Sequence, residues 1–243
     1  MTIVLVHGAW AGAWSWKETA KLLRRRGYDV YAPTLTGIAE RSHVPPERVG
    51  LDTHIEDVAG LMRYEDLSGV LLVGHSYGGM VITGAADREP ARVAGMIYFD
   101  AFLPESGQGL IDIVPPAQRE AQIRNAEAFD GGKSIPRPTA GNPPPDPAFT
   151  AKFAHLFTPQ PFRTMTEPWV TVREEVTWPP RHYILCAEYK TSTFQTIAPR
   201  VRHAPGWTYS ELPALHDVVR TDPRMSADAI AEVAEHMGIA KDA

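Results

Sequence analysis

The sequence predicts an α/β fold, in the form of a doubly wound and mostly parallel sheet, and three observations support this prediction. Short, fully apolar runs such as Val70–Val73 recur along the chain, as expected for strands that are buried on both faces of a parallel sheet. Segments with helical periodicity, such as Leu51–Tyr64, separate these runs. The strands and helices therefore alternate at the spacing of βαβ units.

Residues 1–104 contain four of the predicted strands. The helix predicted after the first strand directs apolar residues such as Leu23 toward the core and ends at Gly27, a residue suited to a C-cap. The segment 34–50 is rich in turn formers and is expected to be a loop. The predicted strands are Thr2–Val6, Tyr28–Ala32, the run that starts at Val70, and Val93–Phe99; the predicted helices are Trp14–Arg26, Leu51–Tyr64 and Met80–Asp87.

The alternation breaks between residues 105 and 180. This segment contains short helical pieces, Pro116–Ala128 and Pro147–Phe157, and a proline-rich connection over 135–145. We expect residues 105–180 to be a cap or lid insertion over the carboxyl edge of the sheet, with 1–104 and 181–243 forming the core; a linker is the alternative for the proline-rich run. The sheet resumes with strand His182–Ala187, helix Phe194–Val201, strand Trp207–Leu212 and helix Ser226–Met237.

Composition and charge exclude several classes of partner. The chain of 243 residues can bury one sizeable core, and its formal charge of −5 gives no general attraction to nucleic acid or to an anionic membrane. Its one cysteine, Cys186, lies in a predicted strand and is expected to be a buried structural thiol. No leader or run of membrane-spanning length is visible, so we expect a cytoplasmic protein.

The sequence also indicates that the chain works without a cofactor. No spacing of histidines and carboxylates suggests a metal site, and no glycine-rich loop matches a nucleotide fingerprint. The expected partner is a small-molecule substrate. The sequence leaves a homodimer open.

One motif gives the predicted fold a chemistry. Gly74-His75-Ser76-Tyr77-Gly78 fits the pattern Gly-x-Ser-x-Gly, and it lies between a predicted strand and a predicted helix. This is the context of a nucleophile elbow, a sharp turn that holds the serine in a strained conformation at the carboxyl edge of the sheet. The glycines leave room for the strand and the helix to pass close together. Ser76 is therefore the expected nucleophile.

A serine hydroxyl needs a base, and the base needs a partner that fixes its tautomer. In this architecture the order along the chain is serine, acid, histidine. His216 is the only histidine between the last predicted strand and the last helix, whereas five others (His43, His54, His155, His203 and His236) are expected to be exposed or to cap helices. The acid is either Asp100 or Glu188, since each follows a predicted strand. We prefer Asp100, which is shorter and has a tight exit from its strand.

The negative oxygen of a tetrahedral intermediate needs preorganised donors. In a nucleophile-elbow architecture these are the amide after the serine and one in the loop after the first strand, here Tyr77 and Ala9. Trp10, Phe102 and Leu103, with Phe162 or Trp169 from the insertion, supply apolar surface around this site. Packing in the core is an alternative for each aromatic residue. No fixed cationic cluster is visible near the motifs, which disfavours charged substrates.

With His7-Gly8-Ala9-Trp10, the serine motif and the late His216 placed, the chain resembles the α/β-hydrolases. The resemblance is to the branch of plant methylesterases and hydroxynitrile lyases with their bacterial esterase relatives. It implies the α/β-hydrolase fold and a small ester substrate. In the lyases a threonine or asparagine matches Gly8 and contacts the cyanohydrin, and in one class a lysine follows the catalytic histidine, where this chain has Asp217. Both positions therefore agree with the esterases, and Gly8 is expected to border the substrate.

The chain departs from the plant esterases at their acid, since Tyr189 stands at the matching position. Some α/β-hydrolases carry the acid on the earlier strand, which favours Asp100. We therefore expect a Ser-His-Asp carboxylesterase that cleaves small, neutral, hydrophobic or aromatic esters through an acyl-Ser76 intermediate. The alternatives are amide or carbamate hydrolysis, hydroxynitrile-lyase-like C–C cleavage on the same triad, and a ligand-binding receptor on a hydrolase fold.

Overall fold

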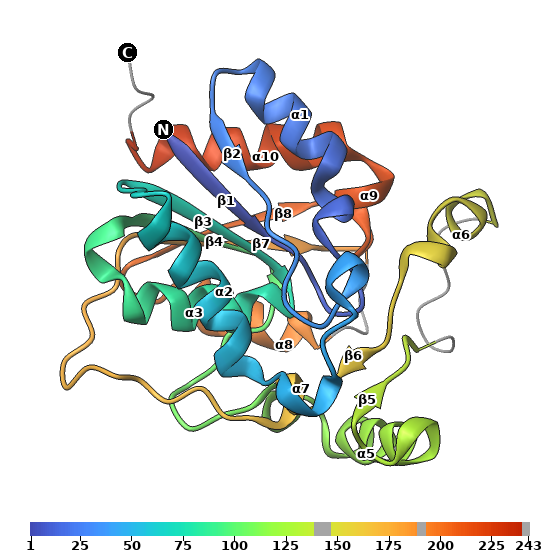
Figure 1. Cartoon of the computed structure of the whole chain (residues 1–243). Helices are drawn as coiled ribbons and strands as arrows, with labels where there is room; N and C mark the ends of the chain where they lie inside the picture. Colours follow the sequence, from blue (N-terminus) through green and yellow to red (C-terminus); the bar gives the residue numbers. More distant parts are fainter. Residues whose placement is uncertain (139–146, 189–192, 240–243) are drawn as a thin grey trace.

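The fold is built around a six-stranded parallel sheet, as the sequence predicts. The computed structural model describes residues 1–138, 147–188 and 193–239, and the strand order is β2-β1-β3-β4-β7-β8. All five strand pairs are parallel, so the carboxyl ends of the strands meet at one edge (Figure 1). The strands are β1 (Thr2–Val6), β2 (Asp29–Tyr31), β3 (Val70–Ser76), β4 (Val93–Ala101), β7 (Arg181–Cys186) and β8 (Trp207–Leu212).

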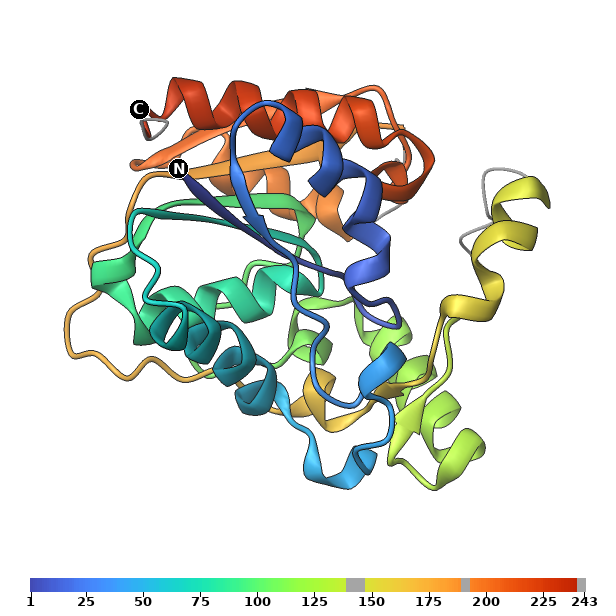
Figure 2. The same ribbon diagram turned by 45° about the horizontal axis from the view of Figure 1, so that its top comes forward.

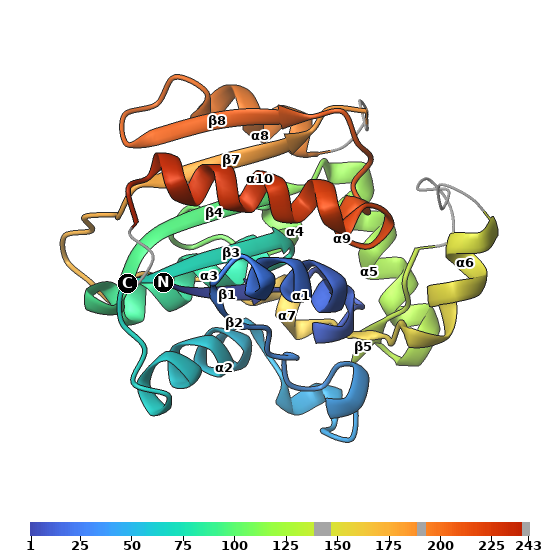
Figure 3. The same ribbon diagram turned by 90° about the horizontal axis from the view of Figure 1, so that it is seen from above.

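Helices cover both faces of the sheet, because alternate strand residues point to opposite sides and are apolar on both. On β3, Leu71 and Val73 pack with α1 (Lys17–Arg25) and α10 (Pro223–His236). Val70 and Leu72 pack on the other face with α2 (Leu51–Tyr64), α3 (Gly78–Arg88) and α8 (Phe194–Val201). Figure 1 shows α1 and α10 above the strands with α2 and α3 below them, and α1 and α10 lie in front of the strands in the view of Figure 3.

Between β4 and β7 the chain leaves the sheet, and we call residues 105–180 the cap segment. It contains α4 (Leu110–Ile113), α5 (Pro116–Asp130), α6 (Pro147–Phe153) and α7 (Arg163–Thr166). Strands β5 (Ser134–Ile135) and β6 (Gln160–Pro161) form a short antiparallel pair within it. Figures 1 and 2 show α5, α6 and this strand pair beside the carboxyl ends of the sheet strands. The division into core and cap domains stays a prediction.

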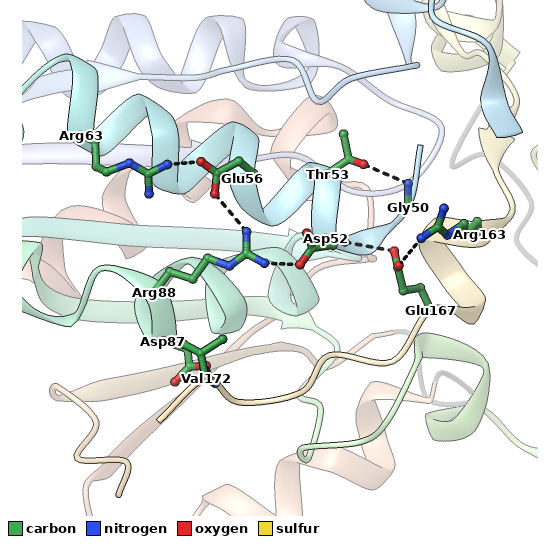
Figure 4. A network of polar contacts seen from close by, with 10 residues as sticks. All are labelled: Gly50, Asp52, Thr53, Glu56, Arg63, Asp87, Arg88, Arg163, Glu167 and Val172. Carbon is green, nitrogen blue, oxygen red and sulfur yellow. Dashed lines mark hydrogen bonds and ion pairs between the residues drawn. The ribbon is translucent and has the colours of Figure 1, made fainter. Parts of the chain in front are cut away.

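Hydrogen bonds fasten the cap segment to α2 and α3, and ion pairs flank them (Figure 4). Glu167, which follows α7, accepts from the amide of Asp52 at 3.2 Å and pairs with Arg163 at 2.6 Å. Arg88 of α3 binds the carboxylates of Asp52 and Glu56 on α2. At the far end of α3, buried Asp87 accepts from the amide of Val172 at 2.9 Å. The cap segment is thus tied to the core through its last third.

Several element boundaries differ from those expected. The predicted first helix begins as a 3₁₀ turn (Ala13–Trp16) before α1, and the predicted helix over 147–157 breaks after Phe153 into a second 3₁₀ turn (Ala154–Leu156). Helix α2 starts from Gly50, whose amide donates to the Thr53 hydroxyl at 3.2 Å. Most of the proline-rich run, 139–146, lies outside the described residues. Of the helices described, none combines the length and the apolar character needed to cross a membrane.

Candidate active site

The backbone at Ser76 has the geometry of a nucleophile elbow. Ser76 ends β3 with φ at +56°, and α3 begins two residues later. A positive φ is a strained conformation for a residue with a Cβ, and such strain is found at functional turns. A Cβ at Gly74 would lie 2.6 Å from the carbonyl oxygen of Gly78, and one at Gly78 would lie 2.6 Å from that of Val6. The two glycines therefore allow the close passage that the motif predicts.

Asp100 lies beside the serine because β4 has a bulge there. His75 pairs with Phe99 and Ser76 pairs with Ala101, so Asp100 is the extra residue between two matched positions. Its φ is +44° and its side chain is fully buried. A bulge aims a side chain out of the strand alternation. This local irregularity turns the Asp100 carboxylate toward the end of β7.

The Asp100 carboxylate binds one donor with each oxygen. Oδ2 lies 2.6 Å from Nδ1 of His216, and Oδ1 accepts from the amide of Cys186 at 3.1 Å. A buried carboxylate is tolerated only when it is hydrogen-bonded. Because a carboxylate accepts, the imidazole carries its proton on Nδ1 and leaves Nε2 as a base. Asp100 therefore fixes the His216 tautomer that a general base requires.

The other candidate acid does not occupy this position. Glu188 is exposed, and its backbone amide donates to the carbonyl of Ala214 at 3.1 Å. Tyr189, at the acid position of the plant esterases, lies outside the described residues. Of the two carboxylates considered, the structure brings only Asp100 to His216.

Two rings that sequence reasoning did not assign to the site, those of His75 and Phe194, lie against His216. The ring of His75 lies 4.5 Å from it between centroids, and Nε2 of His75 donates to the His216 carbonyl at 2.9 Å. Phe194 stacks on the imidazole at 4.8 Å and 15°, and Phe102 packs against Phe194 at 4.9 Å. Burial lowers the pKa of His75 well below its ordinary value, so this imidazole stays neutral. The loop of His216 is thereby held from β3 and covered by α8.

His7 orients the peptide that carries the Ala9 amide. Nε2 of His7 accepts from the amide of Leu35 at 3.0 Å, so Nδ1 carries the proton and donates to the Gly8 carbonyl at 2.8 Å. In a trans peptide the Ala9 N–H points away from that carbonyl. Burial lowers the pKa of His7 to about 4, which keeps the imidazole in this tautomer at neutral pH. The Ala9 amide therefore has a fixed direction.

The Tyr77 side chain is an anchor within the core. It is fully buried, and its hydroxyl lies 2.8 Å from Nδ1 of His54. Nε2 of His54 donates to the Thr36 carbonyl at 2.7 Å. His54 is itself buried, with a pKa lowered by burial to about 4, so the expectation that it would be exposed or cap a helix was wrong. The backbone amide of Tyr77 lies at the N-cap of α3, where amides have no partner within the helix.

The residues expected to border the substrate divide into three groups. A Cβ on Gly8 would lie 2.9 Å from the Ser76 Cβ, and Phe102 donates its amide to the Ser76 carbonyl at 3.0 Å, so both are next to the serine. Leu103 and Trp169 line a separate cleft of about 370 Å³ that also includes Tyr98. The Trp10 ring packs on the core, and its indole donates to the Ile135 carbonyl at 3.0 Å.

Two arginines lie beside His216, although no cationic cluster was expected near the motifs. Asp217, the next residue, pairs with Arg220 of α9 (Val218–Thr221) and with Arg137 of the cap segment at 3.5 Å. Sequence spacing could not reveal the cluster, because Arg137 and Asp217 are 80 residues apart. The expectation of a site without nearby cations was therefore wrong, although Asp217 binds both guanidinium groups.

Comparisons with known proteins agree with this fold. Residues 3–236 match the Alpha/beta hydrolase family. The chain is 37% identical over 235 residues to the Carbendazim hydrolyzing esterase of Nocardioides sp. (strain SG-4G), covering 94% of this chain and 97% of that protein. It is 38% identical over 107 residues to the Alpha-hydroxynitrile lyase of Arabidopsis thaliana, covering 42% of this chain and 40% of the lyase.

A solved structure gives the same result for the fold. An extracellular alpha/beta-hydrolase from a Paenibacillus species, described as sharing structural and functional homology with tobacco Salicylic Acid Binding Protein 2, has a TM-score of 0.85 and 26% identity. The match covers 96% of this chain and 98% of that one. The predicted fold and the resemblance to an esterase and lyase branch are confirmed. The chain belongs to the Alpha/beta hydrolase family.

Proposed function

We propose that the protein is a serine hydrolase of small, neutral, hydrophobic or aromatic carboxylic esters, with Ser76 as nucleophile, His216 as general base and Asp100 as the acid that orients it. The observation that carries the proposal is the 2.6 Å hydrogen bond between Asp100 and His216 beside the strained turn at Ser76. The bond sets the tautomer in which Nε2 can take the serine proton.

The reaction follows from these roles. Ser76 Oγ attacks the ester carbonyl while its proton passes to Nε2 of His216, and the amides of Ala9 and Tyr77 bind the resulting oxyanion. Collapse of the intermediate breaks the bond to the alkoxy group, which takes the proton from His216 and leaves as an alcohol. A water then gives its proton to His216 and attacks acyl-Ser76, releasing the acid and restoring the serine.

The surroundings of His216 support an apolar substrate. Phe194 stacks on the imidazole, and Phe102 packs edge-on against Phe194. The nearby cations are bound by Asp217. Burial of an apolar acyl or alcohol group against such rings is favourable by about 25 cal/mol per Å². A charged substrate would lose its hydration here, and none of the residues named around His216 offers it an unbound cation in compensation.

Cleavage of a short p-nitrophenyl ester tests the proposal directly. The wild type should release p-nitrophenol, and Ser76→Ala should lower kcat by about 10⁶ while keeping the wild-type melting temperature. Serine and alanine differ by one oxygen, so a folded but inactive variant assigns the chemistry to Oγ. Wild-type turnover in folded Ser76→Ala would end the proposal.

A second candidate is carbamate or amide cleavage by the same three residues. It is favoured by the similarity to a relative named for hydrolysing carbendazim, which extends over nearly the whole chain. Incubation with carbendazim and with p-nitrophenyl esters in parallel, followed by mass spectrometry of the products, separates the two candidates. Faster turnover of carbendazim would favour the second.

A further inference from the structure

Three hydrogen bonds from the cap segment to Trp10 hold the loop that carries the Ala9 amide. Trp10 has φ at +62°, a strained value for a bulky side chain. Its amide donates to Oε1 of Gln160 at 3.0 Å, and its carbonyl accepts from the amide of Thr158 at 3.1 Å. Its indole N–H binds the carbonyl of Ile135. All three partners belong to the cap segment, so this conformation depends on contacts from outside the core.

Gln160 is the one side chain among these partners, and it is held on both sides. It is fully buried, and its Nε2 donates to the Thr164 hydroxyl at 2.7 Å. Thr164 is also fully buried, donates to the Pro161 carbonyl at 2.6 Å, and interacts with the Tyr77 phenol. An oxygen or nitrogen of a buried amide side chain that is left without a hydrogen bond costs free energy, and in Gln160 both are bonded. The pair Gln160–Thr164 therefore links the loop of Ala9 to the residue that carries the second amide, Tyr77.

The position of β6 does not require the Gln160 side chain. The backbone of β6 pairs with β5 at Ser134↔Pro161 and Ile135↔Gln160. The amide of Phe162 also donates to the carbonyl of Lys133 at 2.9 Å. The strand is fixed in this way without the side chain, and among the described residues the side-chain oxygen of Gln160 accepts its hydrogen bond from the Trp10 amide.

We propose that Gln160, held by Thr164, is a positioning residue for the oxyanion hole. This inference rests on the proposed function. The bond to the Trp10 amide fixes the peptide between Ala9 and Trp10, while His7 fixes the preceding peptide, so the Ala9 N–H keeps its direction. The contact of Thr164 with the Tyr77 phenol joins the same pair to the residue that carries the second donor. The cap segment thus completes the site that binds the oxyanion.

The test compares two buried glutamines of the cap segment. Gln160→Met keeps the bulk of the side chain and removes the acceptor for the Trp10 amide. Gln122→Met is the matched control: Gln122 is buried on α5, and its side-chain oxygen has no hydrogen-bond partner in the described part of the chain. We expect Gln160→Met to lower kcat for a p-nitrophenyl ester about 10- to 100-fold, since a displaced donor acts on the transition state. KM should stay within about twofold, as for loss of an interaction made only in the transition state.

The inhibition constant of a trifluoromethyl ketone distinguishes a positioning role of Gln160 from a merely structural one. Attack by Ser76 converts the ketone into an anionic hemiketal that uses the oxyanion hole, so its inhibition constant should rise by the same factor as kcat falls. The pH dependence of kcat should be unchanged, because the Asp100–His216 bond is untouched. Gln122→Met should match the wild type in all three measurements.

A second variant covers the case in which Gln160→Met does not fold. Thr164→Ala leaves the Gln160 oxygen in place but removes the hydroxyl that holds its amide, and it should lower kcat about threefold to tenfold at constant KM. If Ser76→Ala is inactive, a wild-type kcat in folded Gln160→Met overturns this inference alone. If Gln160→Met does not fold, a wild-type kcat in Thr164→Ala overturns it in the same way. Absence of ester turnover in the wild type, or its persistence in Ser76→Ala, overturns the proposed function as well.

Discussion

Replacing Asp100 with asparagine should invert the tautomer of His216. The Cys186 amide is a fixed donor 3.1 Å from one carboxylate oxygen, so the asparagine must turn its own oxygen toward it. Its NH₂ group then faces Nδ1 of His216, where the other oxygen of Asp100 had been at 2.6 Å. An NH₂ group donates, so Nδ1 becomes an acceptor and the ring proton moves to Nε2. The imidazole then presents a proton to Ser76 instead of a lone pair.

The size of the effect follows from the loss of the base. Asparagine is nearly isosteric with aspartate, so the binding of substrate and the oxyanion amides should be retained. A triad with the wrong tautomer loses about 10⁴ in kcat, which corresponds to about 5.5 kcal/mol in activation free energy. Glu188→Gln, at an exposed position, should keep the wild-type kcat.

The assay is steady-state hydrolysis of a p-nitrophenyl ester by the two variants, with melting temperatures to verify folding. Nitrogen NMR of His216 should show the proton on Nδ1 in the wild type and on Nε2 in Asp100→Asn. A folded Asp100→Asn within tenfold of the wild type would refute this reasoning. So would an equal loss in Glu188→Gln.

Two further predictions concern the substrate side of the serine and the response to acid. Gly8→Thr should lower ester kcat by about 10² without producing cyanide from mandelonitrile, because its Cβ would lie 2.9 Å from the Ser76 Cβ and displace the serine; rapid cyanide release would contradict this. Burial lowers the pKa of His7 and of His54 from 6.5 to about 4, so the unfolded chain binds more protons and stability is lost as pH falls from 6.5 toward 4. Together these two histidines should reduce the free energy of unfolding by roughly 4 kcal/mol between pH 7 and pH 5. Urea denaturation at the two pH values measures this change, and an equal free energy of unfolding at both would count against the buried neutral state.

The sequence placed Ser76 and Asp100 correctly in the fold because the features that mark these residues adjoin them in the sequence. Ser76 is recognisable because strand, glycines and helix adjoin it in the sequence. Asp100 could be proposed from its place at the end of a strand. The bulge that turns it toward His216 could not, because a one-residue register shift depends on the pairing of β4 with β3.

The residues that were missed act across long stretches of chain. Gln160 and Trp10 are 150 residues apart, and no pattern marks a lone glutamine in an irregular segment. Phe194 occupies an apolar position of a helix, which is indistinguishable in the sequence from a position that packs in the core. His54 was misplaced for the same reason, since its partner Tyr77 lies on another element. Local periodicity predicts elements, whereas these contacts depend on how the elements assemble.

Trapping of the covalent intermediate tests the central claim most directly. The wild type is mixed with a p-nitrophenyl ester, quenched with acid during the first turnover, digested and examined by mass spectrometry. We predict one acyl group on the peptide that contains Ser76, formed with a burst of p-nitrophenol, and no such adduct in Ser76→Ala. Ester turnover by the wild type with the acyl group on another residue, or a first turnover that leaves Ser76 unmodified, would contradict the account.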